Sequence, residues 1–108
     1  MGKSISYIMQ QLIFTSTLDS VHQNLYFSFE QMFEEENYQQ FTQAITDRWL
    51  NTRIIEHVLG ADRVNIRIEY KGLIYVLNFE FYSQSCWLES EAPAPISHLE
   101  TILSQLNG

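Results

Sequence analysis

RVNIRIEYKGLIYVLNFEFY, residues 63–82, is the stretch that decides the fold. Apolar and polar side chains alternate on both sides of Lys71-Gly72, which predicts two antiparallel strands joined by a tight turn. We expect Tyr70 to pair with Leu73, and the rest of the register follows by counting outward. One face of the hairpin is then an apolar surface for the core, made of Val64, Ile66, Ile68, Tyr70, Leu73, Tyr75, Leu77 and Phe79.

The same register separates the two acidic side chains of the hairpin. Glu69 lies opposite Ile74, whereas Glu80 lies opposite Arg63. The two carboxylates are therefore near opposite ends of the ladder, which excludes them as a pair for acid–base catalysis. Arg63 and Glu80 form a cross-strand pair of opposite charge, which is a structural feature.

The second face of the hairpin mixes apolar, amide, arginine and tyrosine side chains. This composition is typical of protein–protein contacts. The alternative is that the N-terminal segment or a helix covers this face. Its members are Asn65, Arg67, Glu69, Ile74, Val76, Asn78, Glu80 and Tyr82.

Helical spacing appears on the N-terminal side of the hairpin. Tyr38, Phe41, Ile45 and Trp49 recur at steps of three and four, which predicts a helix from about 35 to 50. A helical pattern continues to Gly60 through Ile54, Ile55, Val58 and Leu59. Whether residues 35–59 form one helix or two stays open at this point.

The remaining segments complete an α+β domain. We predict a short first helix on the apolar residues of 5–12, strands near 11–18, 24–30 and 86–90, and a final helix from about 96 to 106. The order is (α)ββ-α-βββ-α, in a single domain spanning residues 1–108. We expect a mostly antiparallel sheet of about five strands, with the helices packed on one face.

Charge and cysteine content limit the compartment and the partners. The chain of 108 residues carries a net charge of −7, which argues against nucleic acid or an anionic membrane as a partner and allows a basic protein. The single cysteine, Cys86, permits no internal disulfide, and no apolar segment has the length of a membrane span or a signal peptide. We therefore expect a cytoplasmic protein. Met1 to Ser6 matches an N-myristoylation pattern, but one acyl chain on an acidic protein anchors weakly.

The residue types that carry catalysis or bind metals are scattered. His22, His57 and His98 lie outside any metal-binding motif, and neighbouring Glu56 and His57 point in different directions on a helix. Cys86 opens a strand and is expected to face the core. The four glycines are too far apart to form a phosphate-binding loop. We predict no catalytic residue, no metal site and no cofactor.

An acidic run, Glu34-Glu35-Glu36, is the densest charge in the chain. Carboxylates near a helix N-terminus are stabilised by the helix dipole, which explains the run without any function. The functional alternative is a docking patch for a basic partner.

These observations favour a small acidic binding protein over an enzyme. Its most specific form is an inhibitor or immunity-type protein that neutralises a basic toxin or enzyme, and a second copy of the chain is also a candidate partner. The alternatives are a secretion-chaperone-like dimer, or a ligand-binding domain or enzyme with a pocket lined by Trp49, Tyr75, Phe79 and Cys86. The predicted contact residues are Glu34, Glu35, Glu36, Arg67, Val76 and Tyr82.

Overall fold

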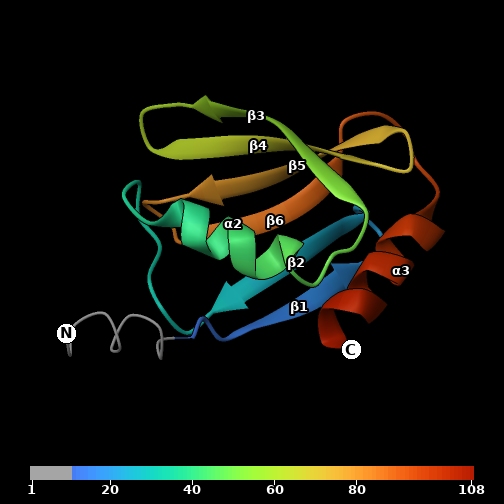
Figure 1. Ribbon diagram of the computed structural model, residues 1–108, viewed down its shortest axis with the longest axis horizontal. Helices are drawn as coiled ribbons and strands as arrows, with labels where there is room; N and C mark the ends of the chain where they lie inside the picture. Colours follow the sequence, from blue (N-terminus) through green and yellow to red (C-terminus); the bar gives the residue numbers. More distant parts are fainter. Residues whose placement is uncertain (1–10) are drawn as a thin grey trace.

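A computed structural model of the chain describes residues 11–108 (Figure 1). The strands are β1 (Phe14–Asp19), β2 (Asn24–Phe29), β3 (Thr52–Leu59), β4 (Arg63–Tyr70), β5 (Leu73–Glu80) and β6 (Ser85–Ser90), and the helices are α2 (Tyr38–Thr46) and α3 (Ile96–Asn107). The myristoylation pattern and most of the predicted first helix lie outside the described residues.

All six strands belong to one antiparallel sheet, in the order β1-β2-β6-β5-β4-β3. The predicted α+β class is confirmed, but the sheet has six strands instead of about five. The pairing of β2 with β6 joins the N-terminal hairpin to the rest of the sheet, so β1 and β3 form the two edges (Figure 1).

The central hairpin has the predicted register. Tyr70 pairs with Leu73, Arg67 with Val76, and Arg63 with Glu80. The turn residues Lys71 and Gly72 have φ angles of 52° and 77°, so both adopt the left-handed conformation that a tight hairpin turn requires. The side chains expected in the core are buried, and only Leu73 at the turn is partly exposed.

Helix α2 carries the predicted apolar stripe but is shorter than expected. Tyr38, Phe41, Ile45 and Trp49 are all buried. The regular helix covers nine residues and ends at Thr46, and the N–H of Trp49 still donates to the carbonyl of Ile45. Trp49 therefore reaches the core from the turn that follows the helix.

The helical interpretation of residues 52–59 is wrong, because they form strand β3. β3 pairs with β4, and a β-bulge at Ile55 shifts the register between Ile54 and Glu56. Glu56 therefore lies beside Arg67, whereas His57 lies beside Ile66 on the other face. The adjacent pair Glu56-His57 points to opposite faces of a sheet.

Both helices pack on the same face of the sheet (Figure 1). The Tyr75 hydroxyl hydrogen bonds with Nδ1 of His98 on α3 at 2.9 Å, and Phe41 of α2 packs edge-to-face on Phe29 at a ring-centroid distance of 4.9 Å. Arg48 donates to the carbonyl of Leu106 at 3.2 Å, which ties the end of α2 to the end of α3. The opposite face of the sheet has no helix over it within residues 11–108.

No helix within residues 11–108 combines the length and the hydropathy needed to cross a membrane.

Candidate interaction face

We call the helix-free surface of the sheet the open face. The pleat and the register decide which side chains point to it, because paired residues of antiparallel strands project to the same side. Along β5, β4 and β3 the open face continues from the predicted second face of the hairpin to the sheet edge. Its main members are Tyr26, Arg53, Glu56, Val58, Arg63, Asn65, Arg67, Glu69, Ile74, Val76, Asn78, Glu80, Trp87, Glu89 and Glu91.

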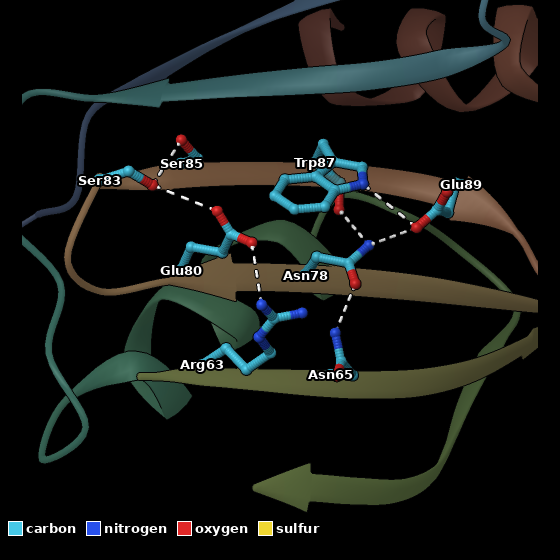
Figure 2. Close-up of polar contacts among 8 residues, drawn as sticks. All are labelled: Arg63, Asn65, Asn78, Glu80, Ser83, Ser85, Trp87 and Glu89. Atoms are coloured by element: carbon cyan, nitrogen blue, oxygen red, sulfur yellow. Dashed lines mark hydrogen bonds and ion pairs between the residues drawn. The ribbon is translucent and has the colours of Figure 1, made fainter. Parts of the chain in front are cut away.

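Asn78 is the centre of a hydrogen-bond network on this face (Figure 2). Its amide nitrogen donates to Glu89 Oε2 at 3.0 Å, and its amide oxygen accepts a hydrogen bond from Asn65. Trp87 Nε1 donates to the same oxygen of Glu89 at 3.2 Å. Asn78 is only 5% exposed although it faces away from the helices, because these neighbours enclose it.

Arg67 connects two carboxylates on the open face. Its guanidinium donates to Glu91 at 2.8 Å and to Glu56 at 3.0 Å. Hydrogen bonds from Arg67 hold the pKa of Glu91 below its ordinary value, and Glu91 and Glu56 in turn raise the pKa of Arg67. The three side chains thus form one ion-pair cluster from β3 to the end of β6.

The other arginines of the open face are also paired. Arg53 lies 2.7 Å from Glu69, and Arg63 lies 3.7 Å from Glu80. Glu89 differs, because its hydrogen bonds within residues 11–108 come from neutral donors only. The open face therefore has one central carboxylate whose charge no described arginine or lysine neutralises.

Three of the predicted contact residues lie toward the open face. Arg67 and Val76 are direct neighbours across β4 and β5, as predicted. Tyr82 lies in the turn after β5 and is 96% exposed, so it stands at the end of the face.

The structure places the acidic run elsewhere. Glu34, Glu35 and Glu36 are exposed in the segment that leads into α2, on the helix side of the sheet. No acidic residue lies in the first turn of α2, since the helix begins at Tyr38. The run is therefore not brought together with Arg67 and Val76.

The histidines lie at three separate places. His22 Nδ1 is 2.8 Å from Asp19 in the β1–β2 turn, which lowers the pKa of Asp19. His57 contacts the hydroxyl of Tyr38 at 3.0 Å, whereas His98 contacts Tyr75. Residues 11–108 contain no group of three side chains placed to hold a metal ion.

Cys86 faces the core, as predicted from its place in the strand. Its side chain is buried, and burial raises the pKa of the thiol well above its ordinary value. The thiolate form that a nucleophile needs is therefore disfavoured.

The residues proposed to line a ligand pocket are all buried in the hydrophobic core: Trp49, Tyr75, Phe79 and Cys86. A depression of about 510 Å³ lies instead beside the polar side of α2, and one of about 210 Å³ lies near Arg63 and Tyr82. Neither depression contains any of the four core residues.

Sequence reasoning missed four important residues of the open face. Trp87 and Glu89 alternate with the buried Cys86 and Leu88, so the period of β6 could have placed them outward. Glu56 was missed because residues 52–59 were assigned to a helix. Glu91 follows β6 and joins the face through tertiary packing, which no local pattern predicts.

A family model described as "Protein of unknown function (DUF3630)" matches residues 13–107, and the chain belongs to this family. No curated protein and no solved structure matches the chain.

Proposed function

We propose that this protein is a non-catalytic interaction module whose open face binds a basic segment of another protein. The carrying observation is Glu89, a carboxylate with neutral donors only, on a face whose described arginines are all paired. A lysine or arginine from a partner is the group that complements it.

The surroundings of Glu89 favour a cationic ligand. Trp87 lies beside it in β6, and Tyr26 lies opposite Trp87 in β2. Aromatic rings next to a carboxylate attract cations through their negatively charged faces. Val76, which pairs with Glu89 across β5, adds apolar contact surface. This mixture fits an extended segment that alternates basic and apolar residues.

The overall charge supports the same class of partner. A net charge of −7 attracts basic proteins over a distance limited by ionic screening. Neutralisation of a basic toxin or enzyme is the most specific form of this proposal.

The two tryptophans provide a direct test. Trp87 lies on the open face, whereas Trp49 is buried on the helix side. A short peptide that alternates arginine and valine should shift the indole N–H resonance of Trp87 in an NMR titration and leave that of Trp49 in place. The same peptide with glutamate in place of arginine should shift neither resonance.

A substitution at Glu89 sharpens this test. Glu89→Gln keeps an oxygen that accepts the hydrogen bonds of Trp87 and Asn78 but removes the charge, so we expect roughly tenfold weaker binding of the basic peptide. Glu100→Gln removes the same charge from an exposed position on α3 and is the matched control.

The acidic run supplies the contradicting outcome. One outcome is that a variant with Glu34, Glu35 and Glu36 changed to glutamine no longer binds the basic peptide, while Glu89→Gln binds it as tightly as the parent does. In that case the open face is not the binding surface. The same conclusion follows if the indole N–H resonance of Trp87 stays unchanged at a saturating concentration of the basic peptide.

A further inference from the structure

The edge strand β3 leaves apolar side chains and backbone hydrogen-bonding groups in solvent. It has β4 on one side and no described strand on the other. An open edge readily pairs with another strand, and β3 is eight residues long and has no described strand beside its outer edge. The exposed apolar residues on or next to β3 are Leu50, Ile54, Ile55, Val58 and Leu59.

We propose that β3 pairs with β3 of a second copy of this chain, antiparallel and about a two-fold axis. The axis passes between Ile54 and Ile55, so each Ile54 lies opposite the partner's Ile55. The two sheets then join into one continuous sheet. This inference goes beyond the proposed binding of a basic protein and does not depend on it.

Charge complementarity supports this register. Arg53 lies opposite the partner's Glu56 on the open face. Within one chain Glu56 already contacts Arg67, which contacts Glu91. The dimer extends this cluster into a row of alternating charge across the axis, from Glu91 through Arg67 and Glu56 to the partner's Arg53.

Apolar side chains are matched in the same register. Ile54 meets the partner's Ile55 next to the axis. At the ends of the ladder, Leu59 approaches the partner's Leu50, and these leucines are 58% and 57% exposed in one chain. Sliding the partner by two residues would place Arg53 opposite the partner's Val58 and Glu56 opposite the partner's Ile55, which loses both kinds of match.

The β-bulge makes the charge match geometrically feasible. Residues three apart on a regular strand point to opposite faces. The bulge at Ile55 puts Arg53 and Glu56 on the same face, beside Glu69 and Arg67 respectively. In the two-fold pair the two bulges face each other, so Ile55, which has no partner in β4, lies opposite the partner's Ile54.

The size of this contact predicts a reversible dimer. Stable complexes usually bury roughly 1,200–2,000 Å² in total, and a single strand pair provides an interface at or below the lower end. The balance between monomer and dimer should therefore depend on concentration in the micromolar range.

Sedimentation equilibrium of the full chain tests the association. We expect a mass that rises with concentration from that of one chain to that of two. Ile55→Lys places two like charges next to the axis and should weaken association by more than about tenfold. Val21→Lys is the matched control, because Val21 is 84% exposed in the β1–β2 turn, and it should dimerise like the parent.

Disulfide cross-linking tests the register. In the double variant Arg53→Cys, Glu56→Cys, each new thiol lies opposite the other thiol of the partner and should form dimers on oxidation. Neither single variant should cross-link efficiently, because Arg53 is far from the partner's Arg53 and Glu56 is far from the partner's Glu56. Cys86 is buried and present in all three variants, so it cannot cause a difference in cross-linking between them.

Three outcomes would overturn the inference. They are a monomer at every concentration, a dimer that Ile55→Lys leaves intact, and cross-linking of a single variant as efficient as that of the double variant. Circular dichroism of Ile55→Lys shows whether the monomer is folded, and an unfolded variant is replaced by Ile55→Thr with the same expected direction. Glu89→Gln should leave the dimer unchanged, so failure of the proposed function and failure of the dimer are distinguishable.

Discussion

Arg67 holds Glu56 on β3 and Glu91 after β6, and so ties together segments on both sides of β4 and β5. Because Arg67 lowers the pKa of Glu91, the folded state binds the proton of Glu91 more weakly than the unfolded chain does. The resulting stabilisation is present above the ordinary value of 4.5 and is lost as the pH falls through the lower pKa of the folded state.

We therefore predict that Arg67→Gln reduces the acid sensitivity of folding. As the pH is lowered from about 5 to about 3, the urea concentration at the midpoint of unfolding should decrease more steeply for the parent than for the variant. In the variant the carboxyl of Glu91 has already lost its main partner. Lys71→Gln removes the same charge at the hairpin turn and should keep the parental slope. Equal slopes for the parent and Arg67→Gln would contradict the role assigned to this ion pair.

Cys86 gives a second prediction at a single residue. Burial raises its pKa, so the native thiol should react slowly with an aromatic disulfide reagent at neutral pH. In urea the thiol should react at the rate of a free cysteine. Fast reaction of the native protein, monitored by absorbance, would show that the β6 region opens frequently.

The main error at the level of elements concerns β3, and its cause is physical. A regular strand repeats every two residues, but the bulge inserts one extra residue at Ile55. The helix-side positions become Thr52, Ile54, His57 and Leu59, with steps of two, three and two. The apolar residues that indicated a helix are divided between the faces, because Ile54 and Leu59 point to the helix side whereas Val58 points to the open face. Both faces of this edge strand are exposed, so apolar residues occur on both and the sequence shows no strict alternation of apolar and polar residues.

The turn before β6 depends on one glutamine. Gln84 has a φ angle of 57°, and its side-chain amide donates to the carbonyls of Phe33 and Phe81 at 2.8 Å and accepts from the N–H of Phe33 at 3.1 Å. These bonds attach the segment before α2 to the β5–β6 turn. Glycine at this position would keep the backbone conformation and lose the three bonds.

Gln84→Gly should therefore lower the free energy of unfolding by roughly 1–3 kcal/mol. Gln23→Gly is a close control, since Gln23 has the same φ angle of 57° in an exposed turn and its side chain makes no hydrogen bond to a described residue. We expect this control to change stability little, as measured by urea denaturation. Equal losses for the two variants would assign the effect to the backbone alone.

On the scale of the whole molecule, the sequence predicted what local periodicity encodes. The hairpin register, the apolar stripe of α2 and the inward position of Cys86 are confirmed, because each depends on neighbouring residues only. The joining of β2 to β6 and the contact of Glu91 with Arg67 depend on packing between distant segments. The outward direction of Trp87 and Glu89 follows from the period of β6, but their place at the centre of the open face depends on this distant packing.

Hydrogen exchange provides a prediction for the entire sheet. Amides of β5 and β6, the two central strands of the sheet, should exchange most slowly, whereas those of the edge strands β1 and β3 should exchange fastest in dilute solution. If the proposed dimer forms, protection of β3 should increase with protein concentration while protection of β1 stays constant. Equal concentration dependence at the two edges would contradict pairing through β3.

The strand order also has a consequence for biosynthesis. The β1–β2 hairpin leaves the ribosome before the other described strands, but β6, the strand on which β2 docks, is the last of the six described strands to be made. The edge of β2 that faces β6 therefore stays unpaired until Ser85–Ser90 has emerged. Closure of so distant a contact is slow relative to the local hairpins. We therefore expect the nascent β1–β2 hairpin to expose an unpaired strand edge during synthesis, which favours contact with a chaperone.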